Sequence, residues 1–130
     1  MTTTFGRLSG AAKAGTDKMT ADMAVDFAGT GVTAVSFWPG FILTDAVRAM
    51  SPEMIPDGLR AMLPLWETPE FSSFVLDALA DDPERGQFAG KAVIGAELGE
   101  RYGIRDTDGK QPISYRGSMG APLEFHAGAA

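Results

Sequence analysis

The stretch from Gly31 to Asp45, GVTAVSFWPGFILTD, decides the fold that the sequence predicts. Its first part, Val32 to Trp38, is a short apolar run rich in β-branched and aromatic residues. Such a run is typical of a strand that is buried on both faces, as in a parallel sheet. Pro39 and Gly40 follow the strand, and ligands of open α/β sheets bind at that carboxyl end. We therefore predict an α/β fold with a candidate ligand site at the Pro-Gly turn.

A helix is predicted immediately before this strand, from Ser9 to Phe27. Apolar and small residues recur there at helical spacing and form one stripe, with charged residues on the other side. Ser9 is the predicted N-cap, and Gly29 to Gly31 would end the helix where the chain reverses. The stripe consists of Ala12, Thr16, Met19, Met23 and Phe27, and the charged side of Asp17, Lys18, Asp22 and Asp26.

Two tripeptides after the central stretch have the residue types of a helix start, SPE at 51–53 and TPE at 68–70. Pro56 and Gly58 predict that the first of these helices is short or broken. The second starts a longer predicted helix, because apolar residues follow it at i, i+3, i+4, i+7 and i+8 until Asp81-Asp82-Pro83 ends the helix. These apolar residues are Phe71, Phe74, Val75, Ala78 and Leu79.

A second strand and a short helix are predicted further along the chain. Lys91 to Gly95 has a short apolar centre and predicts a buried strand. Ala96 to Tyr102 predicts one or two helical turns that Gly103 ends. From Ile104 onward, Gly, Pro, Asp and Ser dominate and predict an irregular extension.

The composition limits the function classes. The chain has 130 residues, of which 45% are hydrophobic and 22% are charged, as in one globular domain. It has no cysteine, which excludes disulfides, a thiolate nucleophile and cysteine-ligated metals. A net charge of -6 argues against a nucleic-acid partner, because phosphate binding needs a basic face. The apolar runs are too short for a membrane span, and we expect a cytoplasmic protein.

Five segments together resemble the short-chain dehydrogenase/reductase superfamily, in the branch with a Trp-Pro-Gly turn. The longest, AAKAGTDKMTADMAVDFAGTGVTAVSFWPGFILTD at 11–45, is similar to the active-site helix and following strand of that family. The resemblance covers nearly all of the chain from Ser9 to Tyr115. The other segments are ETPEF at 67–71, ALADDPE at 78–84, GKAVIGAELGERYGI at 90–104 and DTDGKQP at 106–112.

The resemblance implies a partial Rossmann-type, doubly wound α/β fold. It implies the carboxyl-terminal half of that fold, with about two parallel strands and flanking helices. Residues 9–105 would form this half, between an irregular start at 1–8 and an irregular tail at 106–130. The region from Ala49 to Phe71 corresponds to the variable substrate lid of the family. A homo-oligomer through the Ser9 to Phe27 helix is also implied.

The resemblance also implies a site for NAD or NADP. Lys13 matches the lysine of the Tyr-x-x-x-Lys pair, which holds the cofactor ribose and lowers the tyrosine pKa. Pro39, Gly40 and Thr44 match the turn that contacts the nicotinamide side, partly through backbone groups near Ile42. The implied activity is an NAD(P)-dependent oxidoreductase that acts on a small carbonyl or alcohol substrate.

Two departures from the family pattern predict that the chain is truncated and inactive in isolation. Ser9 stands where the family has its tyrosine, and an aliphatic alcohol is a far weaker acid than a phenol. The Gly-rich phosphate turn and the catalytic serine of the preceding strand have no counterpart in the 130 residues. The alternative function is a non-catalytic remnant or an interaction and oligomerisation module.

Each candidate residue also has a purely structural interpretation. Lys13 fits a surface pair with Asp17 at i+4, and the Pro-Gly turn fits simple loop punctuation. Trp38 and Trp66 are interpreted as core or interface residues. His126, the single histidine, lies in a tail that is a poor support for a Ser-His-Asp triad. The DTDG run at 106–109 is interpreted as a surface turn rather than a calcium loop, because its spacing is wrong.

Overall fold

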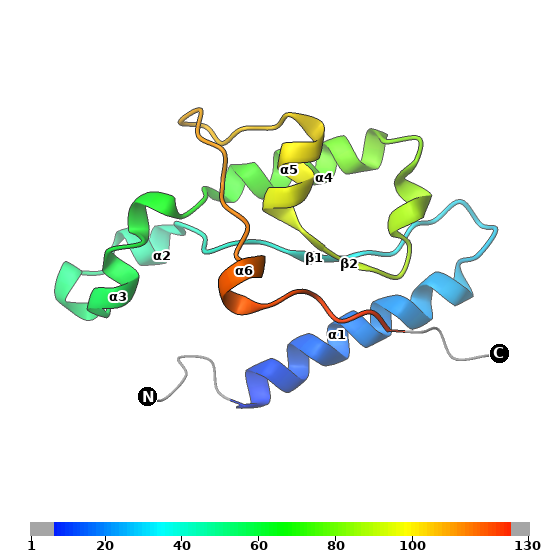
Figure 1. Cartoon of the computed structure of the whole chain (residues 1–130), viewed down its shortest axis with the longest axis horizontal. Helices are drawn as coiled ribbons and strands as arrows, with labels where there is room; N and C mark the ends of the chain where they lie inside the picture. Colours follow the sequence, from blue (N-terminus) through cyan, green and yellow to red (C-terminus); the bar gives the residue numbers. More distant parts are fainter. Residues whose placement is uncertain (1–6, 126–130) are drawn as a thin grey trace. The chain divides into compact units, whose positions relative to one another are not determined.

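The computed structural model describes residues 7–125 (Figure 1). These residues divide into two compact units. The first unit contains residues 7–37, 83–93 and 122–125, and the second contains residues 38–82 and 94–121. His126 and the first part of the predicted irregular start, up to residue 6, lie outside the described residues.

Helix α1, Arg7–Asp26, is the long helix of the first unit. It begins before the predicted start, so Ser9 lies inside the helix and is not its N-cap. The predicted end is confirmed, because Gly29 and Gly31 follow the helix with φ values of 77° and 82°. A residue with a side chain would be strained in that left-handed conformation, which explains why glycine stands where the chain reverses.

The buried face of α1 differs from the predicted apolar stripe. Asp17, Thr20 and Ala21 are buried, whereas the side chain of Met19 is 56% exposed. The reason is that the polar groups of this face have partners. The Ser36 hydroxyl donates to Asp17 Oδ1 at 2.5 Å, and Thr20 Oγ1 donates to the carbonyl oxygen of Thr16 at 2.9 Å. Buried polar groups that are hydrogen-bonded in this way are tolerated in a protein interior.

Strands β1, Ser36–Trp38, and β2, Ala92–Ile94, pair in a parallel sheet, which confirms the predicted α/β class. The strand predicted from Val32 is too long, because Val32 is 56% exposed and the chain pairs as a strand only from Ser36. Burial on both faces is also wrong for β1, since its aromatic residues are only half-buried. The Ser36 N–H donates to the carbonyl oxygen of Lys91 at 3.0 Å and fixes the strand register.

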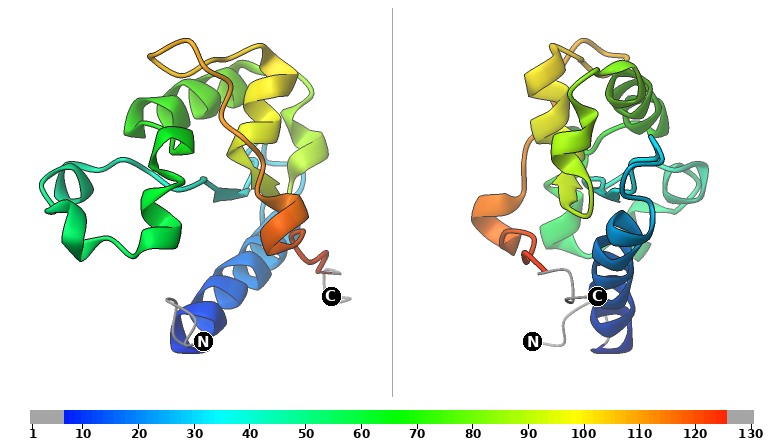
Figure 2. Two further views of the ribbon diagram at one scale, coloured as in Figure 1. Left: turned by 60° about the vertical axis from the view of Figure 1, so that its left-hand side comes forward. Right: turned by 90° about the vertical axis from the view of Figure 1, so that its right-hand side faces the viewer.

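Helices α4, Pro69–Asp81, and α5, Gly95–Tyr102, pack side by side in the second unit (Figures 1 and 2). The predicted apolar face of α4 is confirmed at Phe71 and Val75, which are both fully buried, but it is wrong for Phe74, which is 44% exposed. Gly99 of α5 allows the close approach. A Cβ atom at this position would lie 2.5 Å from Phe71 Cζ, which is too close for any side chain.

Short helical segments complete the described chain. The broken helix predicted after residue 51 is confirmed, since a 3-10 turn and a four-residue helix replace one continuous helix. Gly103 ends α5 with φ 67°, as predicted. None of the helices in the described range combines the length and the apolar character needed to cross a bilayer. The remaining elements are α2 (Asp45–Arg48), α3 (Asp57–Arg60), α6 (Arg116–Met119) and the 3-10 helices Pro52–Met54, Leu63–Leu65 and Arg85–Phe88.

Candidate functional site

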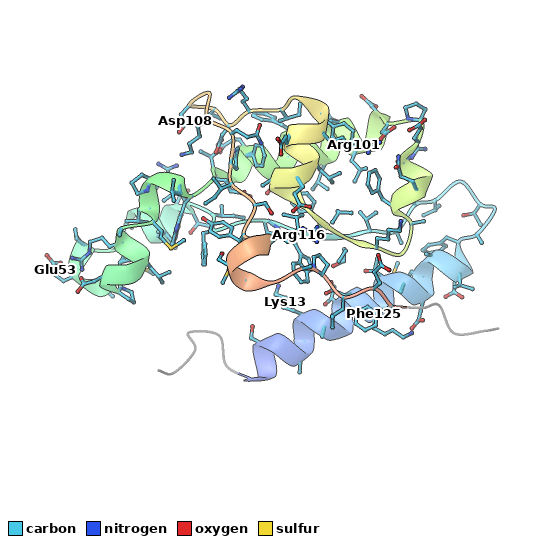
Figure 3. All side chains as sticks on the ribbon, in the orientation of Figure 1. Lys13, Glu53, Arg101, Asp108, Arg116 and Phe125 are labelled. Carbon is cyan, nitrogen blue, oxygen red and sulfur yellow. The ribbon has the colours of Figure 1, made fainter. Side chains whose placement is uncertain are left out.

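Ser9 and Lys13 belong to the first unit and lie one turn apart on α1. Residues four apart occupy the same face of a helix. The Lys13 side chain is exposed and extends from the first half of the helix (Figure 3). The structure thus leaves the lysine ammonium in contact with solvent.

Asp17, the alternative partner for Lys13, is directed elsewhere. It is 6% exposed and accepts the hydrogen bond from Ser36 of β1. The contact ties the middle of α1 to the strand that leads into the Pro-Gly turn. Its carboxylate therefore has a structural partner inside the first unit, and the predicted surface pair with Lys13 is not the contact that buries it.

The Pro39–Gly40 turn follows β1 in the second unit and runs close to two side chains that the sequence did not identify. A Cβ atom at Gly40 would lie 2.9 Å from Glu67 Oε2 and 3.2 Å from Tyr115 Cε2. Glycine is required at this position for close approach, because those atoms already occupy the space. Pro39 itself is exposed.

Ile42 and Glu67 form an isolated parallel β-bridge just after the turn. The Glu67 N–H donates to the carbonyl oxygen of Phe41 at 2.9 Å, and the Leu43 N–H donates to the carbonyl oxygen of Glu67 at 2.8 Å. In a parallel bridge, the residue between the two bonded neighbours, here Ile42, points its own N–H to the side of the strand away from the partner. The Ile42 N–H is thereby turned away from the Glu67 backbone.

Thr44 ends this segment as the N-cap of α2. Its hydroxyl accepts a hydrogen bond from the Val47 N–H at 3.3 Å, and the residue is exposed. Such a cap satisfies one of the free N–H groups at the start of a helix. Thr44 therefore has a structural role that is independent of any cofactor.

The Glu67 carboxylate is the most buried acid near the turn, with only 2% of the residue exposed. It accepts hydrogen bonds from the Gly40 N–H and from Ser72 Oγ, the latter at 3.3 Å. Burial raises the pKa of Glu67 above its ordinary value, and the negative charge of Asp106 acts in the same direction. The two hydrogen bonds lower the pKa but do not cancel the effect of burial.

Aromatic rings enclose the same corner. Phe41 stacks on Trp66, with ring centroids 5.1 Å apart, and meets the Tyr115 ring edge-on at 5.0 Å. Trp66 is 7% exposed, which confirms its predicted place in a core. Burial raises the pKa of Tyr115, and the neighbouring Glu67 carboxylate adds to the shift. The turn is thus backed by an apolar wall with one carboxyl group inside it.

Asp106 is buried and supports the start of α4, so the predicted surface turn is wrong for this residue. Its carboxylate accepts hydrogen bonds from the Thr68 N–H at 2.8 Å and from Thr68 Oγ1 at 2.5 Å. Further along the 106–109 run, the Asp108 carboxylate forms an ion pair with Lys110, whose Nζ lies 2.8 Å from Asp108 Oδ2. Residues 7–125 contain no group of three His, Asp or Glu side chains placed to hold a metal ion.

Arg116, at the start of α6 (Figure 3), forms a two-pronged ion pair with Glu97 of α5. Both contacts are 2.7 Å, and the neighbouring Ser114 hydroxyl donates to the same carboxylate. The hydrogen bond from Arg116 lowers the pKa of Glu97. This contact fixes the irregular segment that carries Tyr115 to helix α5 within the second unit.

Sequence reasoning identified the turn but missed the residues that hold it. These residues come from three separate segments, and their side chains converge only after folding. The one local signal was an acidic residue directly before a helix start, which is usually explained by the helix dipole. The missed residues are Glu67, Ser72, Asp106 and Tyr115.

Four features define the class of the molecule. They are a parallel strand pair, a helix before β1, a helix after β2 and a Pro-Gly turn at the carboxyl end of β1. It is a mixed α/β protein consistent with part of a Rossmann-like fold. No family model matches the sequence.

Two curated proteins are similar to the chain. Dehydrogenase/reductase SDR family member 1 of Mus musculus is 36% identical over 120 residues, which is 88% of this chain and 38% of that protein. The Homo sapiens protein of the same name is 34% identical over 112 residues, which is 82% of this chain and 36% of that protein. The chain thus spans little more than a third of the length of these relatives. By this similarity, it is related to the short-chain dehydrogenase/reductase superfamily.

Proposed function

We propose that the chain contributes the lysine helix and the nicotinamide-facing turn of an NAD(P)-dependent oxidoreductase. The relationship to short-chain dehydrogenase/reductase proteins supports the reaction class. The observation that carries the proposal is the Pro39–Gly40 turn at the carboxyl end of a parallel strand, where dinucleotide folds bind their ligand. A bound nicotinamide would supply or accept a hydride, with a small carbonyl compound or alcohol as the substrate.

The described residues fit a nicotinamide on one side of the turn only. The Gly40 N–H is occupied by Glu67, and the space beside Gly40 Cα is filled by Glu67 and Tyr115. The Ile42 N–H points to the other side, where it is suited to donate to the carboxamide oxygen of the cofactor. Pro39 and Thr44, on either side of this backbone segment, are both exposed.

Lys13 and Ser9 have different roles in this proposal. The Lys13 ammonium would hold the cofactor ribose and would stabilise, by its charge, a phenolate supplied next to it. Ser9 occupies the tyrosine position, and its hydroxyl is too weak an acid to donate the proton at neutral pH. A complete catalytic set would therefore need a phenol and a Gly-rich phosphate turn from outside these 130 residues.

The isolated chain is expected to bind NADH and NADPH weakly and to be inactive. Titration with either cofactor, followed by backbone amide NMR, should shift the Gly40, Ile42 and Thr44 signals with a Kd in the millimolar range. A micromolar Kd would show that the chain forms a cofactor site by itself. Shifts confined to other regions at high cofactor concentration would contradict the assignment of the turn.

Tyrosine at position 9 tests the catalytic part separately. We expect Ser9→Tyr to give no cofactor-dependent reduction of small aldehydes or ketones, because the phosphate-binding turn is still absent. Measurable turnover by this variant would refute the view that the chain is incomplete as a catalyst. The Ser9→Phe variant, which adds the ring without the hydroxyl, is the matched control.

A non-catalytic interaction module is the second candidate function. It is favoured by α1, where Met19 of the predicted apolar stripe is 56% exposed. Two copies of α1 that face each other would cover this side chain in a symmetric dimer. The predicted cytoplasmic location stays a prediction.

A further inference from the structure

We propose that Glu67 is the positioning residue of the cofactor-facing turn, and that its carboxylate and its main chain together fix the Gly40–Leu43 backbone. This inference rests on the proposed function, since it assigns a role to the same turn. It adds a role for the Glu67 side chain itself, which the sequence analysis placed in a segment similar to the family without assigning it to the turn.

The main chain of Glu67 sets the direction of the turn backbone. Its N–H and carbonyl oxygen bond to the residues on either side of Ile42, at 2.9 and 2.8 Å. A strand held by two such bonds cannot rotate its central peptide groups without breaking one of them. The Ile42 N–H is therefore held on the side away from Glu67.

The side chain of Glu67 fixes the residue before this bridge. Its carboxylate accepts a hydrogen bond from the Gly40 N–H. Glu67 Oε2 lies only 2.9 Å from the place that a Cβ atom at position 40 would take. The Ser72 hydroxyl holds the same carboxylate from α4. The turn is thus anchored to the start of α4 by three contacts through one residue.

Burial makes this anchor sensitive to protonation. Among the described residues, Asp106 raises the pKa of Glu67, and the Glu67 carboxylate in turn raises the pKa of the neighbouring Tyr115. The Asp106 carboxylate accepts hydrogen bonds from the Thr68 N–H and Oγ1. The Tyr115 hydroxyl is buried without a hydrogen-bond partner among the described residues. Because the pKa of Glu67 is raised, its carboxyl group becomes fully ionised only at a higher pH than an ordinary glutamate requires.

The first test measures the anchor without any cofactor. The chemical shift of the Gly40 amide should follow a single titration with a midpoint above the ordinary glutamate pKa. Glu67→Gln, which has the same shape and still accepts a hydrogen bond, should abolish this titration and keep the turn folded. Glu70→Gln, the matched control at an exposed glutamate on α4, should leave it unchanged. A Gly40 amide that titrates in the same way in Glu67→Gln would overturn the proposal.

The second test separates a local role from a general loss of stability. In Glu67→Ala, hydrogen exchange of the Gly40 amide should accelerate by about tenfold or more, because a hydrogen bond to a charged group is lost. Glu67→Gln should restore most of the protection. Amides of Val75 and Leu98, in the packed helices of the same unit, report global unfolding. Acceleration at Gly40 no larger than at these two amides would contradict a positioning role.

The third test adds NADH and separates the two proposals. We expect the cofactor-induced shift of the Ile42 amide to weaken by about tenfold in apparent affinity in Glu67→Ala and to recover in Glu67→Gln. Equal shifts in wild type and Glu67→Ala would refute the positioning role and leave the proposed function intact. If no variant shows a shift at the turn, the proposed function fails, whereas the cofactor-free titration of Gly40 still reports the Glu67 contact.

Discussion

Helices α1 and α4 were both predicted from residue spacing, yet only α4 buries most of the predicted face, with Phe74 as the exposed exception. In α4, Phe71 and Val75 are fully buried, while in α1 the predicted member Met19 is more exposed than not. The difference lies in the side chains that define each stripe. Two of the five members of the α1 stripe are Ala12 and Thr16, which gain less from burial than large apolar groups and so define that face more weakly.

Each helix also meets a different kind of partner. Phe71 fills the space above Gly99 of α5, so shape complementarity fixes that contact. Helix α1 instead contacts β1 through the hydrogen bond between Asp17 and Ser36. The spacing of apolar residues predicts packing contacts such as that of Phe71, but it does not predict buried hydrogen bonds such as that of Asp17. The two helices therefore differ in which substitutions each will tolerate.

The largest effect is expected at Phe71. Phe71→Ala should lower the free energy of unfolding by about 3 to 5 kcal/mol, because it removes a fully buried ring and leaves a cavity against α5. Phe74→Ala, on the exposed side of the same helix, is the matched control and should cost less than about 1 kcal/mol. Urea denaturation followed by circular dichroism measures both.

Phe71→Leu keeps more of the side-chain volume, so it can still be measured if Phe71→Ala does not fold. It should cost less than about 1.5 kcal/mol. If Phe71→Ala and Phe74→Ala lost similar stability, the packed α4 face would not be the core of the second unit, and the contrast with α1 would disappear.

A smaller effect is expected at Asp17, where α1 depends on a polar contact. Asp17→Ala should lower the free energy of unfolding by about 1 to 3 kcal/mol, because the buried Ser36 hydroxyl loses its acceptor. Asp22→Ala is the control on the exposed side of α1. It removes only a surface pair with Lys18, so we expect a loss below about 0.5 kcal/mol.

A double-mutant cycle identifies the contact itself. Ser36→Ala combined with Asp17→Ala should cost clearly less than the sum of the two single changes. Additive effects would show that Asp17 stabilises α1 through other neighbours, and the polar explanation for the buried face would be wrong.

The sequence predicted most elements because their signals are local. The Thr68-Pro69-Glu70 start, the Asp81 end of α4 and the Gly103 end of α5 each depend on a few adjacent residues. Strand β1 was predicted too long, because an apolar run does not say which of its residues find a pairing partner. In this chain, pairing begins only at Ser36.

The candidate site was predictable only in part, for a related reason. Pro39 and Gly40 are a local signal, and the family resemblance gave them a role. Glu67 reaches Gly40 from a distant segment, and Asp106 reaches Thr68 across 38 positions of sequence. Such contacts depend on the path of the chain in space, and no spacing rule along the sequence encodes them.

The smallest effect is expected at Met19, and it tests whether the exposed stripe of α1 is used. In a dilute monomer, Met19→Ala should change the free energy of unfolding by less than about 0.5 kcal/mol, since the side chain is already 56% exposed. Met54→Ala, at a methionine of the second unit that is 70% exposed, is the matched control. If two copies pair through α1, sedimentation equilibrium should show weaker association for Met19→Ala than for wild type and Met54→Ala. A loss above about 1 kcal/mol at low concentration, where no dimer forms, would mean that Met19 is buried in the monomer. In that case, the predicted apolar stripe would be right and the contrast between α1 and α4 would be wrong.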